Sequence, residues 1–285
     1  MKILVTGGYG QLGRSISKII KSKTEIFWTA RNVPTGKNGF CLNILDKINL
    51  GALINLFKPD IIINLAALTN VDICEKKPIL AREINTIGVK NICDMFKGKI
   101  IQISTDYVFD GKKGPYSESD KVSPLSIYGS TKLEAERLVM SHNSENLVLR
   151  GNVLYDHNTH SKASFLNWVV NSLNDKIPIS VVNDQINNPT WSQSMARIIM
   201  LSIDQEISGI YHWGDAEFIS RYDFALKIGK KFKLDTNLIK PISTKQLGQF
   251  APRPLKSGLK SNKILQILDT HQPSIDECLN EIMLK

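Results

Sequence analysis

Residues 2–13 read KILVTGGYGQLG, an apolar, β-branched run that ends in a glycine-rich turn. Leu12, Ile16, Ile19 and Ile20 then recur at the spacing of one helix face. A strand, a glycine turn and a helix in this order are the setting of a dinucleotide-binding loop. The segment therefore predicts the first βα unit of a nucleotide-binding sheet, with a merely flexible glycine turn as the alternative.

The spacing assigns a role to each glycine of this loop, although it is G-x-x-G-x-x-G rather than G-x-G-x-x-G. Gly7 permits the tight turn, Gly10 lets a pyrophosphate approach the backbone, and Gly13 lets the helix pack on the strand. The free N–H groups at the helix start would face the phosphates. We expect cofactor contacts from Gly7, Tyr9, Gly10, Gln11, Leu12 and Gly13.

Strand-like and helical segments alternate through the first half of the chain. The clearest strands are residues 26–29, 61–65, 100–104 and 147–149, and the helices between them are residues 48–57, 78–96 and 125–142. Apolar strands that alternate with helices form a parallel sheet covered on both faces. The predicted fold class is α/β, a doubly wound, Rossmann-like parallel sheet with a smaller C-terminal substrate lobe.

The regular alternation loosens after Arg150, where polar residues and prolines separate shorter elements. We expect residues 1–150 to form the dinucleotide-binding domain, and residues 194–213 to return to its sheet as a helix and a strand. Residues 151–193 and 214–285 would form the smaller substrate-binding lobe. The predicted boundary is therefore interleaved along the chain.

Tyr128 and Lys132 stand four residues apart in the helix predicted over 125–142. Side chains at i and i+4 share one helix face. A tyrosine titrates near ~10, and a fixed neighbouring cation lowers that pKa by ~1–3 units. The pair thus predicts a phenol that exchanges a proton near neutral pH, as carbonyl reduction requires. This spacing alone arises by chance on surface helices, but together with the glycine loop it indicates an oxidoreductase.

The formal net charge of +9, from 36 Lys and Arg against 27 Asp and Glu, raises the question of nucleic-acid binding. The lysines are scattered, apart from a mild cluster at Lys227, Lys230, Lys231 and Lys233, with which no aromatic stacking motif interleaves. We expect a solvated helix face and no nucleic-acid partner. The surplus charge would help attract anionic nucleotides.

Membrane and disulfide signals are lacking. No stretch approaches ~20 uninterrupted apolar residues, so no membrane span is predicted, and no leader with a small-residue cleavage pattern is seen. Cys41, Cys74, Cys93 and Cys278 lie far apart without a C-x-x-C. Reduced thiols in a cytoplasmic protein are the expectation.

Several longer motifs together resemble one known family. Residues 103–111 read ISTDYVFDG, and they are followed by PYSE at 115–118 and PLSIYG at 124–129. Further matches are NLAALTNVD at 64–72, EIN at 83–85, DQ at 184–185, PT at 189–190, GIYH at 209–212 and RP at 253–254. Nearly end to end, the chain resembles the extended short-chain dehydrogenase/reductases, in particular the dTDP-4-dehydrorhamnose reductase family.

The resemblance implies that Thr105, Tyr128 and Lys132 are the catalytic residues. Tyr128 would protonate the incipient alkoxide, Lys132 would hold the nicotinamide ribose and keep the tyrosine acidic, and Thr105 would hydrogen-bond the carbonyl oxygen. Thr105 also follows an apolar strand, and open parallel sheets bind ligands at the carboxyl ends of their strands. Core packing is the alternative for Tyr107 and Phe109.

The implied cofactor is NADPH, with NADH as the alternative. No acidic residue follows the second strand to bind a ribose 2′-hydroxyl, whereas Arg31 there would pair with a 2′-phosphate unless it is an incidental surface arginine. Besides the loop, Arg31, Tyr128 and Lys132, the expected cofactor contacts are Asn43, Ile44, Leu65, Ala66, Ala67, Thr69 and Ser104. The expected substrate contacts are Thr69, Val71, Thr105, Asp106, Tyr107, Asn152, Val153, Gln185 and Arg253.

Some positions depart from the family pattern. Some relatives carry carboxylates that hold a metal at a dimer interface, where this chain has Arg14-Ser15 and Ser192-Gln193. We therefore expect no metal, while a homodimer stays open. His157 and His160 lack a third ligand nearby, so they are expected to be a loop pair.

A further departure concerns the sugar. The family block R-T-S-W-V-Y reads RGNVLY at residues 150–155, so Val153 replaces a tryptophan expected beside the hexose. Because this change removes a broad aromatic face, the hexose and the nucleotide base are left open.

The leading functional hypothesis is NADPH-dependent reduction of a nucleotide-linked 4-keto-6-deoxy sugar, which would supply activated deoxysugar for surface polysaccharide. A non-catalytic regulatory subunit of the methionine adenosyltransferase type is the second hypothesis, and the intact set of Thr105, Tyr128 and Lys132 argues against it. A nucleotide-sugar epimerase or dehydratase is the third. Asp106 followed by Tyr107, instead of by a second carboxylate, favours a reductase.

Overall fold

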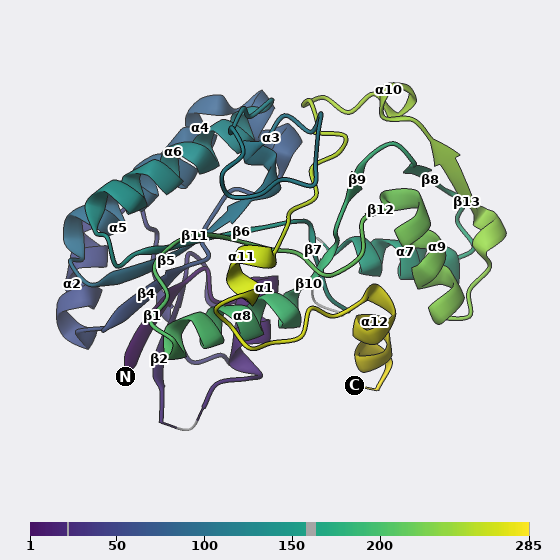
Figure 1. Cartoon of the computed structure of the whole chain (residues 1–285). Helices are drawn as coiled ribbons and strands as arrows, with labels where there is room; N and C mark the ends of the chain where they lie inside the picture. Colours follow the sequence, from purple (N-terminus) through teal and green to yellow (C-terminus); the bar gives the residue numbers. More distant parts are fainter. Residues whose placement is uncertain (22, 158–163, 285) are drawn as a thin grey trace.

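A seven-stranded sheet, parallel at every neighbouring pair, forms the centre of the molecule (Figure 1). The computed structural model describes residues 1–21, 23–157 and 164–284. The strand order is β11-β6-β5-β4-β1-β2-β3. Its strands are β1 (Lys2–Thr6), β2 (Glu25–Ala30), β3 (Phe40–Cys41), β4 (Ile61–Asn64), β5 (Lys99–Thr105), β6 (Leu147–Gly151) and β11 (Gly209–Trp213). The predicted Rossmann-like sheet is confirmed, because the chain runs outward from β1 to β3 and then returns to β4 on the other side of β1.

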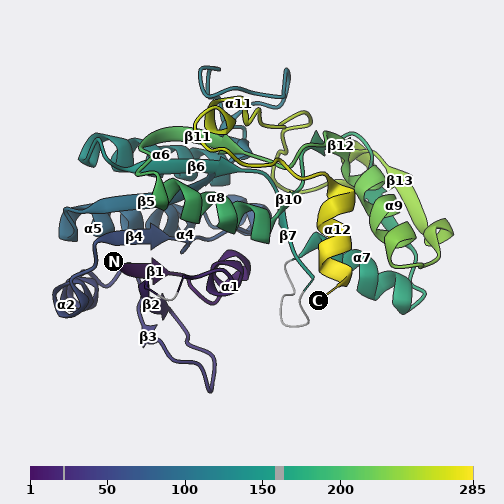
Figure 2. The same cartoon turned by 60° about the horizontal axis from the view of Figure 1, so that its bottom comes forward.

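Helices cover both faces of this sheet, which makes it doubly wound (Figure 2). On one face, Leu12 of α1 (Gln11–Ser17) packs in a cluster with Met195 of α8 (Ser192–Asp204). On the other face, Leu50, Ile92 and Val139 come from α2 (Lys47–Phe57), α5 (Gly88–Met95) and α6 (Ile127–His142). Burying each such side chain contributes ~1.5–3 kcal/mol, so the two clusters hold the strand ends in fixed positions.

The connection from β4 to β5 is helical but not one regular helix. It runs through α3 (Val71–Lys76), α4 (Pro78–Arg82), a π-helical turn (Glu83–Ile87) and α5, where the sequence predicted a single helix over 78–96. Asn85 in the π turn accepts a hydrogen bond from the Leu68 N–H at 2.7 Å and donates to the Leu68 carbonyl at 3.1 Å. These two bonds fix the loop that follows β4.

Helix α6 begins beside the end of β5. Ser126 caps it by accepting a hydrogen bond from the Gly129 N–H at 3.3 Å. A Cβ at Gly129 would lie 2.2 Å from the Tyr107 carbonyl oxygen, so only glycine allows the first turn of α6 to approach the loop after β5 this closely. The approach brings Tyr128 next to that loop.

A smaller lobe packs around a cluster of its own that includes Trp191, Phe224 and Leu279 (Figure 1). Its main helices are α7 (Phe165–Asn174), α9 (Arg221–Lys231) and α12 (Ile275–Met283), with the short helices α10 (Thr244–Leu247) and α11 (Asn262–Leu265) elsewhere in the C-terminal region. Three two-stranded sheets pair β7 (Leu154–Tyr155) with β10 (Thr190–Trp191), β9 (Ile186–Asn187) with β12 (Ile219–Ser220), and β8 (Ile179–Val182) with β13 (Ile239–Ile242). Between the lobe segments, α8 and β11 return to the main sheet, and Tyr211 of β11 pairs with Leu149 of β6.

The cysteines and the helix lengths complete the description of the fold. Cys74, Cys93 and Cys278 are buried free thiols, and Cys41 is an exposed one. Across the described ranges, the helices are all too short or too polar to cross a membrane.

Candidate active site

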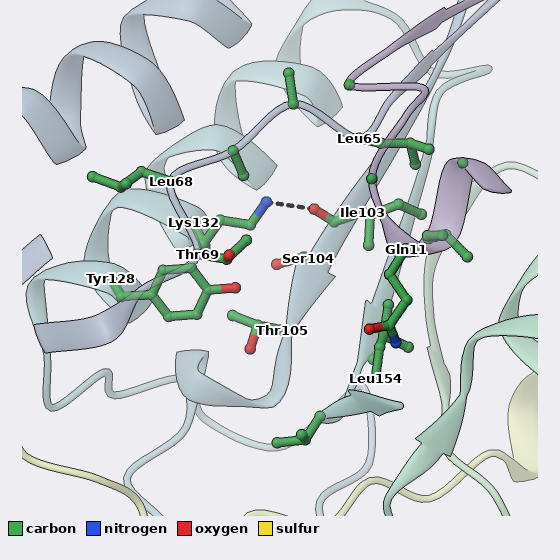
Figure 3. Close-up of a pocket in the computed structure, with 18 of the residues that line it drawn as sticks. Gln11, Leu65, Leu68, Thr69, Ile103, Ser104, Thr105, Tyr128, Lys132 and Leu154 are labelled. Atoms are coloured by element: carbon green, nitrogen blue, oxygen red, sulfur yellow. Dashed lines mark hydrogen bonds between the residues drawn. The ribbon is translucent and has the colours of Figure 1, made fainter. Parts of the chain in front are cut away.

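A cavity of about 990 Å³ lies at the carboxyl ends of β1, β4, β5 and β6 (Figure 3). Open parallel sheets bind ligands at this edge, near the point where the strand order reverses between β1 and β4. The sheet side of the wall includes Gly7, Gly10, Gln11, Leu12, Gly13, Arg31, Asn43, Ile44, Leu65, Ala66, Ala67, Thr69, Val71, Ser104, Thr105, Asp106, Tyr107, Tyr128, Lys132, Asn152 and Val153. Ser104 and Thr105 are the last residues of β5, Arg31, Asn43 and Ile44 come from the segments after β2 and β3, and the others lie in the loops after β1, β4, β5 and β6 or on α1, α3 and α6.

The glycine-rich loop packs tightly between β1 and α1. The Gly10 N–H donates to the Gly7 carbonyl at 3.0 Å, which closes the turn. A Cβ at Gly13 would lie 2.0 Å from the Gly8 carbonyl oxygen, so α1 can approach the loop only with glycine at this position. The loop therefore keeps its backbone at the cavity edge.

Lys132 is a buried cation, and a hydrogen bond holds its ammonium near the end of β5. Its Nζ donates to the Ile103 carbonyl at 2.6 Å, as Figure 3 shows. Burial lowers the pKa of Lys132 to about 8, and the nearby Glu136 carboxylate opposes that change. The ammonium is therefore largely protonated at neutral pH and loses its charge in mildly alkaline solution.

Glu136, one helical turn beyond Lys132, is neutralised on its far side by Arg150. The Arg150 Nε donates to Glu136 at 2.9 Å and a terminal guanidinium nitrogen donates at 2.7 Å, so the buried pair is bidentate. Ser104 also donates to Glu136. These bonds join α6 to β5 and β6 directly behind the Lys132 side chain.

The pKa of Tyr128 does not follow the prediction made from its spacing to Lys132. Burial raises the pKa of this phenol well above its ordinary value, and a hydrogen bond with Thr105 opposes the rise only in part. Lys132 is not among the groups that lower it, and its ammonium donates to the Ile103 carbonyl. In Figure 3 the Tyr128 hydroxyl points toward Ser104 and Thr105. The phenol is thus a proton donor at neutral pH.

The residues that follow Thr105 form a buried polar group beside the phenol. Thr105 Oγ1 donates to the Asp106 carboxylate at 3.1 Å and accepts from the Tyr107 N–H at 3.2 Å. Burial raises the pKa of Asp106 to about 6, while a 2.5 Å hydrogen bond from Ser257 lowers it. The Tyr107 ring lies edge-on to the Tyr128 ring, with centroids 5.7 Å apart. Phe109, in contrast, lies in a core cluster and stacks on Tyr116.

Three residues expected at the site lie outside the cavity wall. The Tyr9 hydroxyl donates to the Asn38 carbonyl at 2.5 Å, and the Gln185 amide donates to Thr244 and Gln249 at 3.0 and 2.7 Å. Arg253 forms an ion pair with Asp72 at 3.0 Å. In each case a neighbouring polar group within the protein holds the side chain.

Two side-chain atoms on the cavity wall are buried without a hydrogen-bond partner in the described part of the chain. They are the Asn152 Oδ1 and the Gln11 Nε2. Because a buried unpaired polar atom is unfavourable by ~1–3 kcal/mol, both suit a ligand that supplies the missing partner.

Sequence reasoning missed several residues that line the cavity. They come from α1, α7 and α9 and include Arg14, Phe165, Trp168 and Arg221. Trp168 is 42% exposed, which is high for tryptophan and consistent with a ligand-facing position. The only signal in the sequence was the apolar periodicity near 165–173, which indicates a helix but not which face meets a cavity.

Metal ligands do not gather in the part of the chain that the structure describes: no group of three or more His, Cys, Asp or Glu side chains is placed to hold an ion. The His157 ring lies 3.2 Å from the Asn167 side-chain oxygen. His160, its predicted loop neighbour, lies outside the described residues. The expectation that the protein needs no metal stays a prediction.

A doubly wound parallel sheet, a glycine-rich loop after β1 and a Tyr-x-x-x-Lys pair beside the end of β5 define the short-chain dehydrogenase/reductase class. Within this class, the chain belongs to the family of the RmlD substrate binding domain, whose model matches residues 1–285. The resemblance to the dTDP-4-dehydrorhamnose reductase family is thereby confirmed.

The names of the relatives in this family indicate two different functions. The dTDP-4-dehydrorhamnose reductase of Aggregatibacter actinomycetemcomitans is 32% identical over 288 residues, which cover 96% of this chain and 95% of that protein. The methionine adenosyltransferase 2 subunit beta of Xenopus laevis is 32% identical over 276 residues, which cover 92% of this chain and 81% of that protein. The crystal structure of dTDP-4-dehydrorhamnose reductase from Bacillus anthracis, in complex with NADP, matches with a TM-score of 0.91 at 28% identity and covers 99% of this chain and 98% of that one.

Proposed function

We propose that the protein is an NADPH-dependent reductase of a nucleotide-linked 4-keto-6-deoxy sugar, with Thr105, Tyr128 and Lys132 as its catalytic residues. One observation carries the proposal: these three side chains, from β5 and α6, line a single cavity together with the glycine-rich loop. The Aggregatibacter reductase supports the reaction, and the NADP-bound Bacillus anthracis reductase supports the cofactor.

The residues at the loop end of the cavity fit a dinucleotide. Gly7 has a φ of +65°, and a Cβ there would lie 2.8 Å from the Ala66 nitrogen, so glycine keeps this approach open. The Gln11 Nε2, which has no hydrogen-bond partner in the described ranges, is a donor that suits a phosphate oxygen. Arg31 is exposed on the wall just after β2 and would pair with the 2′-phosphate that distinguishes NADPH from NADH. When bound, NADPH supplies the hydride.

The protein side chains would handle the oxygen and the proton. Tyr128, protonated at neutral pH because burial raises its pKa, would donate its proton to the oxygen of the reduced carbonyl. Thr105 would hydrogen-bond the same oxygen. The Lys132 ammonium would stabilise the developing tyrosinate and bind the nicotinamide ribose, in exchange for its bond to the Ile103 carbonyl.

The two lobes would divide the ligands between them. Residues 1–150 with 194–213 would bind the dinucleotide, and residues 151–193 with 214–285 would bind the sugar nucleotide. In support of this division, α7 and α9 of the smaller lobe contribute Phe165, Trp168 and Arg221 to the cavity wall. The side chains of Gln185 and Arg253 bond to other groups of the protein, so these two residues would stabilise the conformation of the smaller lobe and would not contact the substrate.

The reduced product would be an activated deoxysugar for surface polysaccharide. Location in the cytoplasm, a homodimer and the lack of a nucleic-acid partner stay predictions.

A second candidate is a regulatory subunit of methionine adenosyltransferase, favoured by the identity to the Xenopus subunit. That identity equals the one to the Aggregatibacter reductase, so sequence similarity does not decide between the two. The convergence of Thr105, Tyr128 and Lys132 on one cavity favours the reductase, because a regulatory surface has no need of a buried proton donor.

The test is NADPH oxidation with 4-keto-6-deoxy sugars linked to dTDP, UDP, GDP and CDP. We expect turnover with at least one of them and none with the Tyr128→Phe variant. Parent protein that binds NADPH but reduces none of these sugars, and that instead changes the kinetics of a methionine adenosyltransferase from the same organism, would establish the regulatory alternative.

A further inference from the structure

A row of buried polar side chains crosses three strands of the sheet behind Lys132. Ser104 of β5, Arg150 of β6 and His212 of β11 are register partners on neighbouring strands. Side chains at register positions of neighbouring strands lie on the same face of a sheet. Ser104 and Arg150 both bond to Glu136 of α6, so the row lies on the face that α6 covers.

His212 adds no charge to this row. Burial lowers its pKa to about 3, and the Arg150 charge acts in the same direction. The His212 Nε2 lies 3.2 Å from an Arg150 guanidinium nitrogen, and its Nδ1 lies 3.1 Å from the Tyr116 carbonyl oxygen. Because a guanidinium only donates and a carbonyl only accepts, the neutral ring carries its proton on Nδ1 and accepts from Arg150 at Nε2. Arg150 is therefore the single positive charge of the row.

Glu136 balances that charge and lies one helical turn from Lys132. Its carboxylate accepts two hydrogen bonds from Arg150 and one from Ser104. On the same face of α6, the Lys132 Nζ donates to the carbonyl of Ile103, the residue before Ser104 (Figure 3). Lys132 and Glu136 thus bond to consecutive residues of β5. These bonds fix the ammonium and the carboxylate relative to each other.

Within the described ranges, Glu136 is the charged group that acts on the Lys132 ammonium. Burial lowers the pKa of Lys132, and the Glu136 carboxylate opposes that fall. The other titratable side chains that face this part of α6 act on other groups: Cys74 of α3, Asp106 and Tyr107 act on Tyr128, and Arg150 is bonded to Glu136. On α4 and α5 the charged side chains form ion pairs at the surface, Arg82 with Glu134 and Lys90 with Asp94, and Glu83 of the π turn is exposed.

We propose that Glu136 is a positioning residue of the reaction: held by Arg150 and Ser104, its carboxylate keeps the Lys132 side chain charged and directed at the end of β5. The proposal rests on the proposed function for the reaction that Lys132 serves. Glu136 is not among the described residues of the cavity wall, so it would act on a ligand only through that ammonium. Since Tyr128 needs the ammonium while its tyrosinate forms, loss of the carboxylate would narrow the pH range of the reaction at its alkaline end.

Three variants and one control test the assignment. Glu136→Gln removes the charge and keeps the size of the side chain, whereas Glu136→Asp keeps the charge. The double variant Glu136→Gln/Arg150→Gln removes both charges of the pair, because a buried guanidinium left without its partner can prevent folding. Glu134→Gln removes a carboxylate of the same helix that pairs with Arg82 and, two residues from Lys132, lies on another face of α6.

Two measurements follow the charge of Lys132 as the pH changes. The pH profile of kcat/KM reports it through the reaction. The rate at which acetic anhydride acetylates Lys132, measured by peptide mass spectrometry, reports the neutral amine and needs no substrate. Lys132 lies on the cavity wall, where a small reagent can reach it, and the exposed Lys230 in the same samples is the internal reference.

A nearby opposite charge shifts a pKa by about 1–3 units. We expect the midpoints of both profiles to fall by about one pH unit or more in Glu136→Gln and in the double variant. Glu136→Asp should restore most of this shift, and Glu134→Gln should match the parent. The acetylation profile of Lys230 should be the same in all proteins.

The outcomes separate this inference from the proposed function. A lowered acetylation midpoint of Lys132 in the two Gln variants, without turnover of any 4-keto sugar by the parent, would support the role of Glu136 and reject the proposed reaction. Turnover by the parent with an unchanged acetylation midpoint in both variants would reject the inference alone. A loss of activity that is equal at every pH would show that Glu136 only stabilises the fold, and it would also overturn the inference.

Discussion

The Asn152 side chain donates through Nδ2 to Oδ1 of Asn188 at 2.6 Å. Three further hydrogen bonds fix the Asn188 side-chain amide in one orientation. Its Nδ2 donates to the carbonyls of Asp215 and Leu259 at 3.0 and 3.1 Å, and its Oδ1 also accepts from the Leu259 N–H at 2.9 Å. The Asn152 Oδ1, which has no hydrogen-bond partner among the described residues, is thereby left at the cavity wall. Asn152 presents an acceptor, and not a donor, to the ligand.

This orientation predicts a substrate with a hydroxyl donor next to Asn152. Asn152→Ala should lower kcat/KM for the preferred sugar by about 5- to 150-fold, the equivalent of ~1–3 kcal/mol for a lost buried hydrogen bond. NADPH affinity serves as the control and should not change. Equal kcat/KM for parent and variant across the sugar panel would show that the Asn152 oxygen meets no donor.

Val153 leads to a separate prediction about the hexose. It lines the cavity where relatives are expected to place a tryptophan, so an aromatic contact of ~0.5–1.5 kcal/mol is missing. We expect dTDP-4-keto-rhamnose to be a mediocre substrate and Val153→Trp to improve its kcat/KM relative to the other sugars. If the parent already prefers dTDP-4-keto-rhamnose clearly over the panel, the prediction is wrong.

Tyr128→Phe should abolish turnover while the cofactor still binds. The substitution keeps the ring and its edge contact with Tyr107 but removes the proton donor, which typically contributes ~10²–10⁴-fold. NADPH affinity, measured by fluorescence titration, should stay within a few-fold of the parent. Turnover at the parental rate would mean that another group supplies the proton.

The lowered pKa of Lys132 predicts that kcat/KM falls in alkaline solution. Because burial lowers its pKa to about 8, the ammonium loses its charge as the pH rises through that value, and kcat/KM should fall. Tyr128 keeps its proton in this range, since its pKa is raised. A pH profile of kcat/KM between pH 6 and 10, roughly the span between the ordinary His and Lys pKa values, checks this.

Unfolding of the protein would not account for this fall in kcat/KM at alkaline pH. The unfolded chain holds the lysine proton up to about 10.4, whereas the folded protein releases it near 8, so in this window the unfolded state binds more protons. The contribution of Lys132 to the free energy of unfolding therefore increases with pH from about 8 to 10.4. A thermal midpoint that fell in step with kcat/KM would instead assign the limit to denaturation.

Arg31 should decide the choice of cofactor. A charge-assisted pair with the 2′-phosphate contributes ~1.5–3 kcal/mol, so Arg31→Ala should narrow the preference for NADPH over NADH by roughly tenfold or more. Arg137→Ala, which removes an exposed charge of α6 that is not on the cavity wall, is the matched control. Equal dissociation constants of the parent for NADPH and NADH would contradict the assignment.

The sheet and its loop could be predicted from the sequence because the forces that form them are local. Glycine at 7, 10 and 13 after an apolar run leaves few other conformations, and the alternation of apolar strands with helices requires a parallel sheet covered on both faces. The i, i+4 spacing of Tyr128 and Lys132 likewise placed both side chains on one face of α6.

Motif resemblance identified side chains but not their directions. Tyr9, Gln185 and Arg253 belong to matching motifs, yet each bonds to a partner within the protein and lies off the cavity wall. The pKa of Tyr128 could not be derived from spacing either, since burial by segments far apart in the chain raises it.

By itself, the sequence determined a nucleotide-binding parallel sheet with a tyrosine–lysine pair at its active edge. Only the tertiary structure decided what faces that pair. Asn152 is oriented by Asn188 and Arg221 is held against Phe165, in each case by a contact between segments far apart in the chain. Such contacts depend on how the smaller lobe packs over the strand ends, and no local pattern of residues encodes that packing.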